Sequence, residues 1–368
     1  MSALRILHVV GTMDFGGVET LLMTIYRQLD REKIQFDFLC HNTMDCKFTE
    51  EIRSLGGRMY MVNGPRHVGF RGYGRELYTF FKAHPEYTIV HCHKSDNNGL
   101  ILKQAKRAGV PHRISHCHIA DCTYPFPMSV LVAYMRALNR RCLTERFACS
   151  VDAGEYLFGK NAEFTVLPNA ISTEQFTFSQ EKRTACRAAL GLSDDTLCIG
   201  HVGRFAEQKN HRFLLEVFAS LHEAHPNTRL LLLGGGELEK PIREKTAALG
   251  LEDCVIFGGL HSDLSGFYAA MDLFLFPSLF EGLGIVAVEA QCSGLPVVAS
   301  ENVPHEAKVV DTMQFLPLDA PVSQWAETVY AAASAENDHR AAAAETVAKS
   351  MFNIQTMAAF LQDYYLKL

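Results

Sequence analysis

Residues 272–300, DLFLFPSLFEGLGIVAVEAQCSGLPVVAS, have the pattern of a strand, a glycine-rich turn, a helix and a second strand. The first apolar run ends at Pro277, and Gly282 and Gly284 form the turn that leads into the helix. A strand that returns through a helix to another strand is the repeating unit of parallel sheets. This segment therefore predicts an α/β fold with a parallel sheet.

The same alternation of short apolar runs and longer amphipathic stretches continues along the whole chain. Because 368 residues exceed what one hydrophobic core usually supports, we expect two doubly wound parallel-sheet domains. Segment 168–180 lacks helical periodicity, so we predict domain 1–172, domain 173–349 and a closing amphipathic helix at about 350–368. The expected strands are 5–11, 35–41, 58–62, 88–93, 112–117 and 146–150 in the first half, and 197–203, 229–235, 255–259, 272–277, 296–300 and 313–318 in the second.

The composition is that of an ordinary globular protein and argues against several classes. No apolar run reaches the roughly 18 residues that cross a bilayer, and the start lacks the pattern of a secretory signal, so we expect a cytoplasmic protein. The eleven cysteines have no paired spacing, which predicts reduced thiols. A net charge of −6 does not favour nucleic acid as a partner.

Positive charge is concentrated in the first half of the chain, where residues 1–178 hold 21 Lys and Arg against 17 Asp and Glu. Arg136, Arg140, Arg141 and Arg146 fall in an expected helix, which could face anionic lipid headgroups or a phosphorylated acceptor. A solvated helix face explains the same pattern. Peripheral contact with the inner face of a membrane is therefore one of two open interpretations.

Two HCH triplets end neighbouring predicted strands. His91 and His93 are two residues apart, so both point to one face of the sheet, and His116 and His118 repeat the arrangement. Ligands bind beyond the carboxyl ends of parallel strands, so we expect these side chains to border a ligand. The C-x-x-C spacing of structural zinc sites is missing, so we expect no metal. The alternatives are a zinc site and polar residues that only finish a strand.

The first predicted strand leads into a glycine pair, Gly16 and Gly17, followed by a helix. Such a loop lets the backbone approach an anion and presents the N–H groups of the helix N-terminus to a phosphate. A purely conformational role is the alternative. The loop is not G-x-G-x-x-G, and no acidic residue ends the second predicted strand, which argues against a dinucleotide-dependent dehydrogenase.

Four charged residues follow predicted strands of the second half. Arg204 and Lys209 follow strand 197–203, and two cations at one strand end suit a diphosphate. Glu281 and Glu289 are eight positions apart, so both carboxylates can face one cleft if Glu281 lies at the helix start. Carboxylates pair well with the vicinal hydroxyls of a sugar or ribose, and a helix N-terminus holds a phosphate. The alternatives are solvated loop cations and two solvated glutamates.

Three motifs together resemble the signature of retaining nucleotide-sugar glycosyltransferases of family 4. They are GRF-x-x-QKN at 203–210, FPS-x-x-EG-x-G-x-x-x-x-EA at 276–290 and GGVET at 16–20. The first, continued by a histidine and a helix, is especially similar to bacterial capsule and exopolysaccharide transferases. VLPNAI at 166–171 resembles the family's interdomain connection, and the closing helix resembles the one that crosses back onto the first domain. The resemblance implies the GT-B fold, in which two Rossmann-like domains face each other across a cleft.

The resemblance also implies roles for individual residues of the donor site. Arg204 and Lys209 match the pair that neutralises the diphosphate leaving group. Glu281 matches the carboxylate that touches the donor sugar, and Glu289 matches the one that binds the ribose hydroxyls. The donor-binding residues implied in this way are Gly16, Gly17, Arg204, Lys209, Glu281, Gly282, Gly284, Ile285, Val286 and Glu289.

One histidine also matches the family pattern. His118, in HIAD, resembles the histidine near the sugar C6 hydroxyl and the reaction centre, and His116 competes for this assignment. His93 and His116 are expected on the acceptor side. The implied catalytic residues are His118, Glu281, Arg204 and Lys209.

The implied reaction is transfer of a sugar from a nucleotide-diphosphate donor, UDP in preference to GDP, to a saccharide or a lipid-diphosphate-linked saccharide, with retention of anomeric configuration. We expect no cofactor and no metal, because no D-x-D element follows a predicted strand to hold a divalent cation. Two alternatives stay open. One is a GT-B-type epimerase or hydrolase of nucleotide sugars, and the other is a non-catalytic nucleotide-sugar-binding subunit.

Overall fold

The computed structural model describes residues 3–14, 16–41, 43–119, 124–335 and 340–368. The chain forms two compact units. Unit 1 comprises Met1–Ala170 and Ile354–Leu368, and unit 2 comprises Ile171–Asn353. The sequence had suggested boundaries at 172 and about 350.

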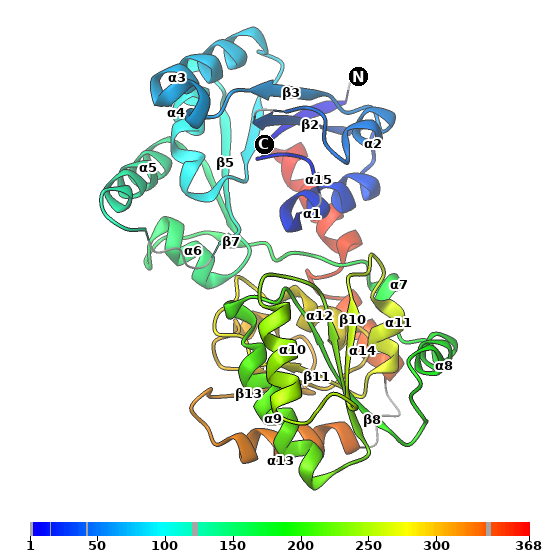
Figure 1. The fold of residues 1–368 in the computed structure, drawn as a ribbon. Helices are drawn as coiled ribbons and strands as arrows, with labels where there is room; N and C mark the ends of the chain where they lie inside the picture. The colour runs from blue at the N-terminus through cyan, green and yellow to red at the C-terminus, as the bar shows by residue number, and fades with distance from the viewer. Residues whose placement is uncertain (1–2, 15, 42, 120–123, 336–339) are drawn as a thin grey trace. The chain divides into compact units, whose positions relative to one another are not determined.

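Unit 1 is built on a seven-stranded parallel sheet in the order β3-β2-β1-β4-β5-β6-β7 (Figure 1). The strands are β1 Leu4–Val9, β2 Ile34–His41, β3 Met59–Val62, β4 Ile89–Cys92, β5 His112–Cys117, β6 Glu145–Ala148 and β7 Thr165–Val166. The helices are α1 Gly17–Gln28, α2 Thr49–Ser54, α3 Pro65–Ala83, α4 Asn98–Ala108, α5 Met128–Cys142, α6 Val151–Phe158 and α15 Ile354–Lys367, with a 3-10 turn η1 Ser95–Asn97.

The two faces of the unit 1 sheet are covered by different helices. Leu7 and Cys92 point to the face that forms a core with α3 and α4. The alternate residues point to the opposite face, where the C-terminal helix α15 lies beside α1 (Figure 1). There the hydroxyl of Tyr365 lies 2.7 Å from Nδ1 of His91, and Gln362 Oε1 accepts a hydrogen bond of 3.0 Å from the backbone N–H of Asp30. The C-terminal helix therefore completes the core of unit 1.

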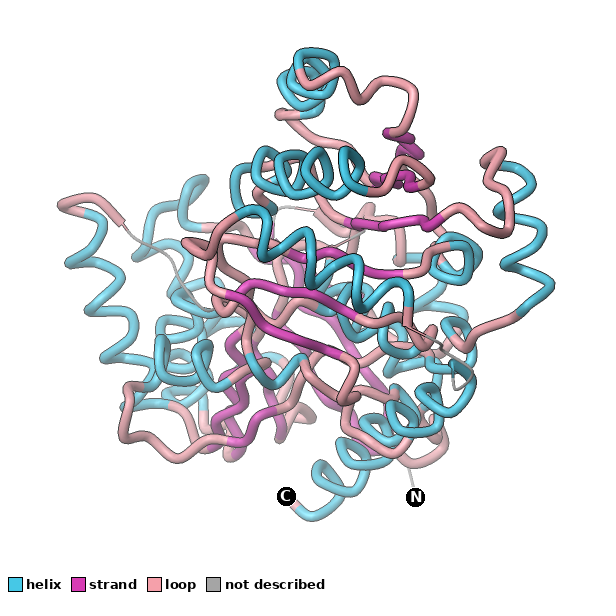
Figure 2. Tube along the Cα trace, turned by 90° about the horizontal axis from the view of Figure 1, so that it is seen from below, coloured by secondary structure: helices cyan, strands magenta, loops and turns pink. Residues whose placement is uncertain are grey.

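Unit 2 is built on a six-stranded parallel sheet in the order β10-β9-β8-β11-β12-β13. Helices, drawn in cyan in Figure 2, flank the magenta strands. The strands are β8 Leu197–Val202, β9 Thr228–Leu233, β10 Val255–Gly259, β11 Leu273–Phe276, β12 Val297–Ser300 and β13 Met313–Leu316. The helices are α7 Thr173–Phe176, α8 Gln180–Ala189, α9 His211–Ala224, α10 Glu239–Ala248, α11 Ser265–Ala270, α12 Ile285–Cys292, α13 Val322–Ser334 and α14 Arg340–Ala348, with 3-10 turns η2 Glu207–Lys209 and η3 His305–Ala307.

Strand β11 illustrates why the strands of unit 2 consist almost entirely of apolar residues. Leu273 and Leu275 belong to the core cluster that contains residues of α9 and α13. Phe274 and Phe276 point the other way, into the cluster that contains residues of α12 and α14. Because both faces are buried, neither set of alternate positions tolerates polar residues.

The six strands of unit 2 have the same order as the first six strands of unit 1, so the prediction of two doubly wound parallel-sheet domains is confirmed. The order reverses between β1 and β4 in unit 1 and between β8 and β11 in unit 2. Ligands of doubly wound sheets bind at this switch point, at the carboxyl ends of the strands. The prediction missed β7, whose two residues are too short to show any periodicity.

The predicted basic helix is wrong in two respects. Arg146 lies in strand β6 and not in helix α5, because α5 ends at Cys142. Arg136 is not a solvated cation, since its Nε donates a 2.7 Å hydrogen bond to the buried carboxylate of Asp96.

The ten cysteines of the described residues are free thiols. None of the described helices combines the length and the apolar character needed to cross a membrane.

Candidate active site

An ion pair links the two strand ends at the switch point of unit 2. Lys209, in the turn after β8, places its Nζ 2.7 Å from Oε1 of Glu281, in the loop after β11. The Lys209 Nζ also lies 5.0 Å from the centre of the Phe276 ring. Both side chains are mostly buried, with exposed fractions of 14% and 7%, so a cation and a carboxylate are held at the carboxyl edge of the sheet.

The two loops are fixed to each other by hydrogen bonds. The backbone N–H of Leu279 donates to the carbonyl of Gln208 at 2.8 Å. The Gln208 side-chain amide donates to the carbonyl of Phe280 at 3.0 Å and to Oε2 of Glu281 at 3.3 Å. Because several contacts set this geometry, Lys209 and Glu281 are held in place before any ligand binds.

Helix α12 begins directly after this loop. Its N-cap is Gly284, with φ +83°, a left-handed conformation that favours glycine. A Cβ atom at this position would lie 2.8 Å from Cε1 of Phe276, so a larger residue also meets a steric limit. Ile285 and Val286 form the first turn, whose N–H groups have no partners within the helix and can receive an anion.

The predicted geometric relation between the two glutamates is wrong. Because α12 starts at Ile285, Glu281 lies four positions before the helix, and the two-turn spacing does not relate it to Glu289. Glu281 is positioned by Lys209 and Gln208. Glu289 lies within α12 and accepts a 2.8 Å hydrogen bond from the hydroxyl of Tyr268. Burial raises the pKa of Glu289 to about 7, and the hydrogen bond from Tyr268 opposes this rise.

Arg204 has a partner different from that of Lys209. Its guanidinium is largely exposed and lies 3.0 Å from Oε2 of Glu237. The two cations expected to act together therefore follow the same strand but are held by different carboxylates. The Arg204–Glu237 pair is solvated, so it holds Arg204 only weakly.

In unit 1, the loop that contains the predicted glycine pair lies close to Lys94, a residue that no sequence motif indicated. Gly16 is the N-cap of α1 and Gly17 is its first residue. A Cβ atom on the neighbouring Gly11 would lie 3.2 Å from Nζ of Lys94, which follows β4. Burial lowers the pKa of Lys94, and the charge of Glu19 partly opposes this effect. A lysine directly after the first HCH triplet, at a strand end, was the signal available in the sequence.

The four predicted histidines form one buried cluster with a fifth, His8, on the face of the unit 1 sheet that carries α15. The ring centres of His91 and His93 are 4.2 Å apart, and those of His116 and His118 are 4.0 Å apart. Nδ1 of His93 lies 3.0 Å from Nε2 of His118. His8, on β1 directly opposite His91 in the register, places Nδ1 3.0 Å from Nε2 of His93. The pairing of β1 with β4 brings His8 here, and no local spacing could reveal it.

The chain resembles known glycosyltransferases in both halves. Residues 15–175 match the model of the family described as Glycosyltransferase Family 4, and residues 182–341 match that of Glycosyl transferases group 1. The chain is 35% identical to the putative glycosyltransferase EpsF of Bacillus subtilis, over 98% of this chain and 96% of that protein. The chain belongs to the family 4 glycosyltransferases of the GT-B fold.

Two further relatives of this family 4 glycosyltransferase extend the comparison. It is 23% identical to the Escherichia coli UDP-Gal:alpha-D-GlcNAc-diphosphoundecaprenol alpha-1,3-galactosyltransferase, over 81% of this chain and 80% of that protein. The crystal structure of HepE from Anabaena in complex with UDP has a TM-score of 0.82 at 18% identity, with complete coverage of both chains. At that identity the structural likeness establishes the fold.

The donor, acceptor and catalytic residues predicted for the glycosyltransferase are divided between its units. Arg204, Lys209, Glu281, Gly282, Gly284, Ile285, Val286 and Glu289 belong to unit 2, whereas Gly16, Gly17, His93, His116 and His118 belong to unit 1. Gln208 and the run Gly234–Gly236 were missed. A Cβ atom on Gly234 would lie 2.0 Å from the carbonyl oxygen of Gly203, so this run allows the loops after β8 and β9 to touch. Three glycines after the strand-like run RLLLL were the available signal.

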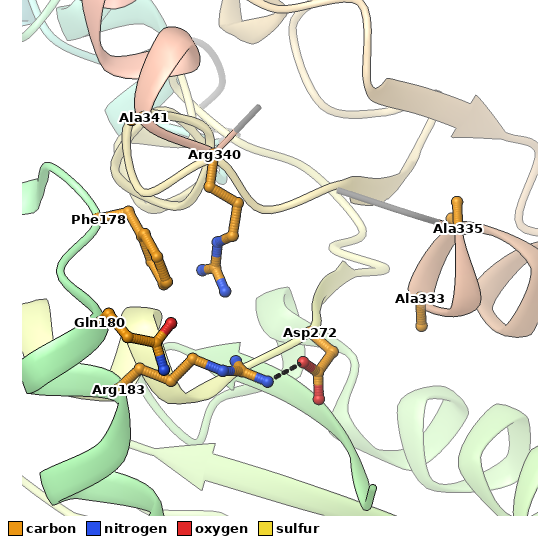
Figure 3. A pocket seen from close by; sticks show the side chains of 9 residues that line it. Phe178, Gln180, Arg183, Asp272, Ala333, Ala335, Arg340 and Ala341 are labelled. Atoms are coloured by element: carbon orange, nitrogen blue, oxygen red, sulfur yellow. Dashed lines mark hydrogen bonds and ion pairs between the residues drawn. The ribbon is translucent and has the colours of Figure 1, made fainter. Parts of the chain in front are cut away.

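The glycosyltransferase also has a pocket of about 480 Å³ at the opposite edge of the unit 2 sheet (Figure 3). Asp272, just before β11, accepts hydrogen bonds from Arg183, Arg187 and the N–H of Cys198. The Arg340 guanidinium points into the same region and donates to four backbone carbonyls. These charged groups already have partners, so we assign them a structural role and place the candidate active site at the other edge.

Proposed function

We propose that this glycosyltransferase moves a sugar from a UDP-sugar to a saccharide linked to a lipid diphosphate, with retention at the anomeric carbon, during the assembly of an extracellular polysaccharide. The full-length similarity to EpsF supports the pathway, and the similarity to the galactosyltransferase supports the kinds of donor and acceptor. The UDP complex of HepE, which has the same fold, supports the nucleotide.

The single observation that carries the proposal is the Lys209–Glu281 pair beside the first turn of α12. Negative charge develops on the departing diphosphate, and fixed positive groups stabilise it more in the transition state than in the ground state. Lys209 supplies a point charge, and the N–H groups of Ile285 and Val286 supply oriented dipoles. Arg204, released from its solvated partner Glu237, supplies a forked donor for two phosphate oxygens.

The two carboxylates bind the two ends of the donor. Glu281 accepts hydrogen bonds from the transferred sugar, and Glu289 accepts them from the ribose hydroxyls. Gly16 and Gly17 allow the backbone to approach the donor without a side chain in between. His118 lies beside the sugar C6 hydroxyl. These assignments follow the family motif position by position.

The proposed chemistry uses no divalent metal on the diphosphate, because Arg204, Lys209 and the α12 N-terminus supply the compensating charge. The leaving diphosphate takes the proton from the acceptor hydroxyl on the same face of the sugar, and this front-face route accounts for retention. The protein thus contributes positioning and fixed charge, and no side chain is assigned as a covalent nucleophile.

For the lipid-linked acceptor, we propose that unit 1 contacts the cytoplasmic face of the membrane through a basic groove. The groove has a volume of about 650 Å³ and is lined by residues of α3, α4 and α5. Arg71, Arg75, Lys103 and Arg107 line it together with several aromatic and aliphatic side chains, and its lining has no acidic residue. Two apolar or aromatic side chains of α5 are also exposed at this face. Tyr134, which lines the groove, is 53% exposed, and Val130, one turn before it, is 60% exposed. Cations with exposed apolar groups suit an anionic lipid surface.

The decisive experiment measures thermal stabilisation of the full chain by a panel of UDP- and GDP-sugars, because a ligand that binds only the folded state raises Tm. We expect UDP compounds to stabilise the protein and Glu289→Ala to remove the shift. The stabilising donor is then incubated with and without acceptor, and the anomeric configuration of the product is read by NMR. Rapid conversion without acceptor would establish the epimerase or hydrolase alternative, and binding without turnover would establish a non-catalytic subunit.

A further inference from the structure

The five-histidine cluster of unit 1 contains a group of nitrogens with the spacing of a metal site. One ring nitrogen from each of His93, His116 and His118 lies within 4.8 Å of the other two. Tetrahedral ligands about 2.0–2.1 Å from a zinc ion are roughly 3.3 Å apart. The 3.0 Å separation between Nδ1 of His93 and Nε2 of His118 is close to that value. The three rings can therefore converge on one ion with small movements.

Buried ring nitrogens without hydrogen-bond partners also favour the binding of a cation here. Neither nitrogen of His116 makes a hydrogen bond of normal geometry with the described residues, although its side chain is almost fully buried. The backbone of Leu167 lies near His116 but makes no hydrogen bond of normal geometry with it. A buried polar group without a partner costs free energy, which a coordinated ion would offset.

The neighbours of the three rings resemble the outer partners of metal ligands. If Nδ1 of His93 binds the ion, its Nε2 remains 3.0 Å from Nδ1 of His8, which can accept its proton. On the other side, the Asn169 side chain is near His118, and Oδ1 of Asn169 and Nδ1 of His118 are both buried without a hydrogen bond of normal geometry to the described residues. Ligating histidines usually donate their second N–H to such a group, which fixes the ring orientation.

We propose that His93, His116 and His118 form a binding site for one divalent transition-metal ion of the zinc class. Three neutral imidazoles suit zinc, cobalt, nickel and copper, and they do not suit magnesium or calcium. The sequence argued against zinc because neither triplet has the local spacing of a metal site. The structure supplies the missing ligands from the neighbouring strand, since β4 pairs with β5 and brings the two triplets together.

This site is separate from the diphosphate chemistry proposed above, but one consequence rests on that proposed function. The ion would occupy Nε2 of His118, so the side chain could no longer contact the sugar. Metal binding is therefore expected to inhibit transfer reversibly, and the chelator-treated enzyme is expected to remain active.

The test titrates chelator-treated full-length protein with Co²⁺, whose visible absorption reports tetrahedral coordination, and measures the stoichiometry by equilibrium dialysis with elemental analysis. We expect one ion per chain, displaced by Zn²⁺. His116→Ala and His93→Gln should each weaken binding more than about 100-fold, whereas His8→Ala, which removes an outer partner, should weaken it about 10- to 100-fold. His67→Ala, on the exposed surface of unit 1, is the matched control and should bind as the wild type does.

Two results would overturn the proposal. The first is the absence of saturable binding of Co²⁺ or Zn²⁺ by the wild-type protein, which would leave the cluster as a hydrogen-bonded network. The second is loss of binding in His8→Ala and His91→Ala while His116→Ala binds normally, because the ion would then lie in the alternative group His8, His91 and His93. His116→Asn replaces His116→Ala if circular dichroism shows that the latter is unfolded. Since binding is measured without donor, its failure is distinct from failure of the proposed transferase activity.

Discussion

The Nζ atom of Lys209 lies 2.7 Å from Oε1 of Glu281, although 71 residues separate the two in the chain. The pair joins the loops after β8 and β11, the two strands at which the sheet order reverses. A donor diphosphate bound here would meet a lysine already held in place, and a glutamate whose second oxygen is oriented by Gln208. Preorganised charge of this kind stabilises a transition state without reorganisation during the reaction.

Lys209→Ala should lower kcat by roughly 100- to 1000-fold, the range seen when one fixed donor to a developing oxyanion is removed. The loss arises because the departing diphosphate retains an uncompensated charge. Initial rates at saturating UDP-sugar measure it. Lys245→Ala removes a surface lysine paired with Glu216 in the same unit and should leave kcat unchanged. Equal rates for Lys209→Ala and wild type would remove Lys209 from the proposed machinery.

Glu289 should make both stability and donor affinity depend on pH. Its folded pKa of about 7 lies above its ordinary value of 4.5 because burial disfavours the charged form. Between those values the folded state holds a proton that the unfolded state has lost, so its contribution to stability falls as pH rises to about 7 and is constant above. Glu289→Gln should lack this dependence, and Tm measured across that range against wild type tests it.

The same carboxylate should bind ribose hydroxyls better when it is ionised. UDP affinity measured by calorimetry should therefore be weaker at ~pH 6 than at ~pH 8. Glu281→Gln, measured alongside, should retain the pH dependence, since it leaves Glu289 in place. A flat affinity profile in wild type would show that ionisation of Glu289 does not govern donor binding.

Gly284→Ala should destabilise the protein by about 2–4 kcal/mol and weaken UDP binding. The left-handed backbone disfavours any side chain, and the new Cβ would lie 2.8 Å from Cε1 of Phe276, displacing the start of α12. Gly266→Ala is the matched control within the same unit. Its Cβ would meet no atom closer than 3.8 Å, so it should stabilise helix α11 by about 0.5–1 kcal/mol. Chemical denaturation measures both, and similar effects of the two changes would contradict the prediction.

Arg340→Met should destabilise unit 2 by about 3 kcal/mol while UDP affinity changes less than about twofold. The substitution leaves the carbonyls of Tyr268, Ala269, Met271 and Ser293 without their donor, at the sheet edge opposite the candidate site. Arg243→Ala, which breaks an exposed pair with Glu239 and removes the contact of its guanidinium with the Phe257 ring, should cost only about 1 kcal/mol. Loss of UDP binding by folded Arg340→Met would instead connect this pocket to the active site.

Arg71→Ser combined with Arg75→Ser should reduce binding to vesicles of anionic phospholipid by about 10- to 30-fold at low salt, because each cation near such a surface contributes about 1 kcal/mol. Cosedimentation with the vesicles measures this. Arg212→Ser combined with Arg243→Ser makes the same change of charge in unit 2 and should have little effect. Equal losses from both pairs would indicate a response to net charge and not to the groove.

Most of the fold was readable because its strands are buried on both faces. Runs such as LFLF in β11 are continuous and apolar, so they differ clearly from the amphipathic helices between them. Helix boundaries were harder to read. Gly282 and Gly284 suggested that α12 opened at the glycines, but only the left-handed Gly284 caps it, and Glu281 remains in the loop. Arg146 was assigned both to the expected strand 146–150 and to the basic helix, and the structure places it in strand β6.

The candidate site was only partly readable for a related reason. The motifs indicated Lys209, Glu281 and Glu289, and the structure brings the first two together at the carboxyl edge of the sheet. Lys94 and Gln208 were missed, since each gains its place through contact with another loop, at Gly11 and at Phe280. The fifth histidine, His8, was missed because only the β1–β4 register places it beside His91.

The amino-acid order by itself determined the two parallel sheets, the glycine turns and the kinds of charged side chain at the strand ends, because these depend on burial and backbone conformation over short segments. Tertiary structure alone decided which side chains meet. Lys209 pairs with Glu281, whereas Arg204 pairs with Glu237. His93 lies within 3.0 Å of both His118 and His8. Hydrogen bonds and ion pairs act over a few ångströms in space, whereas the partners here are separated by tens of residues along the chain, so only strand pairing brings them within reach.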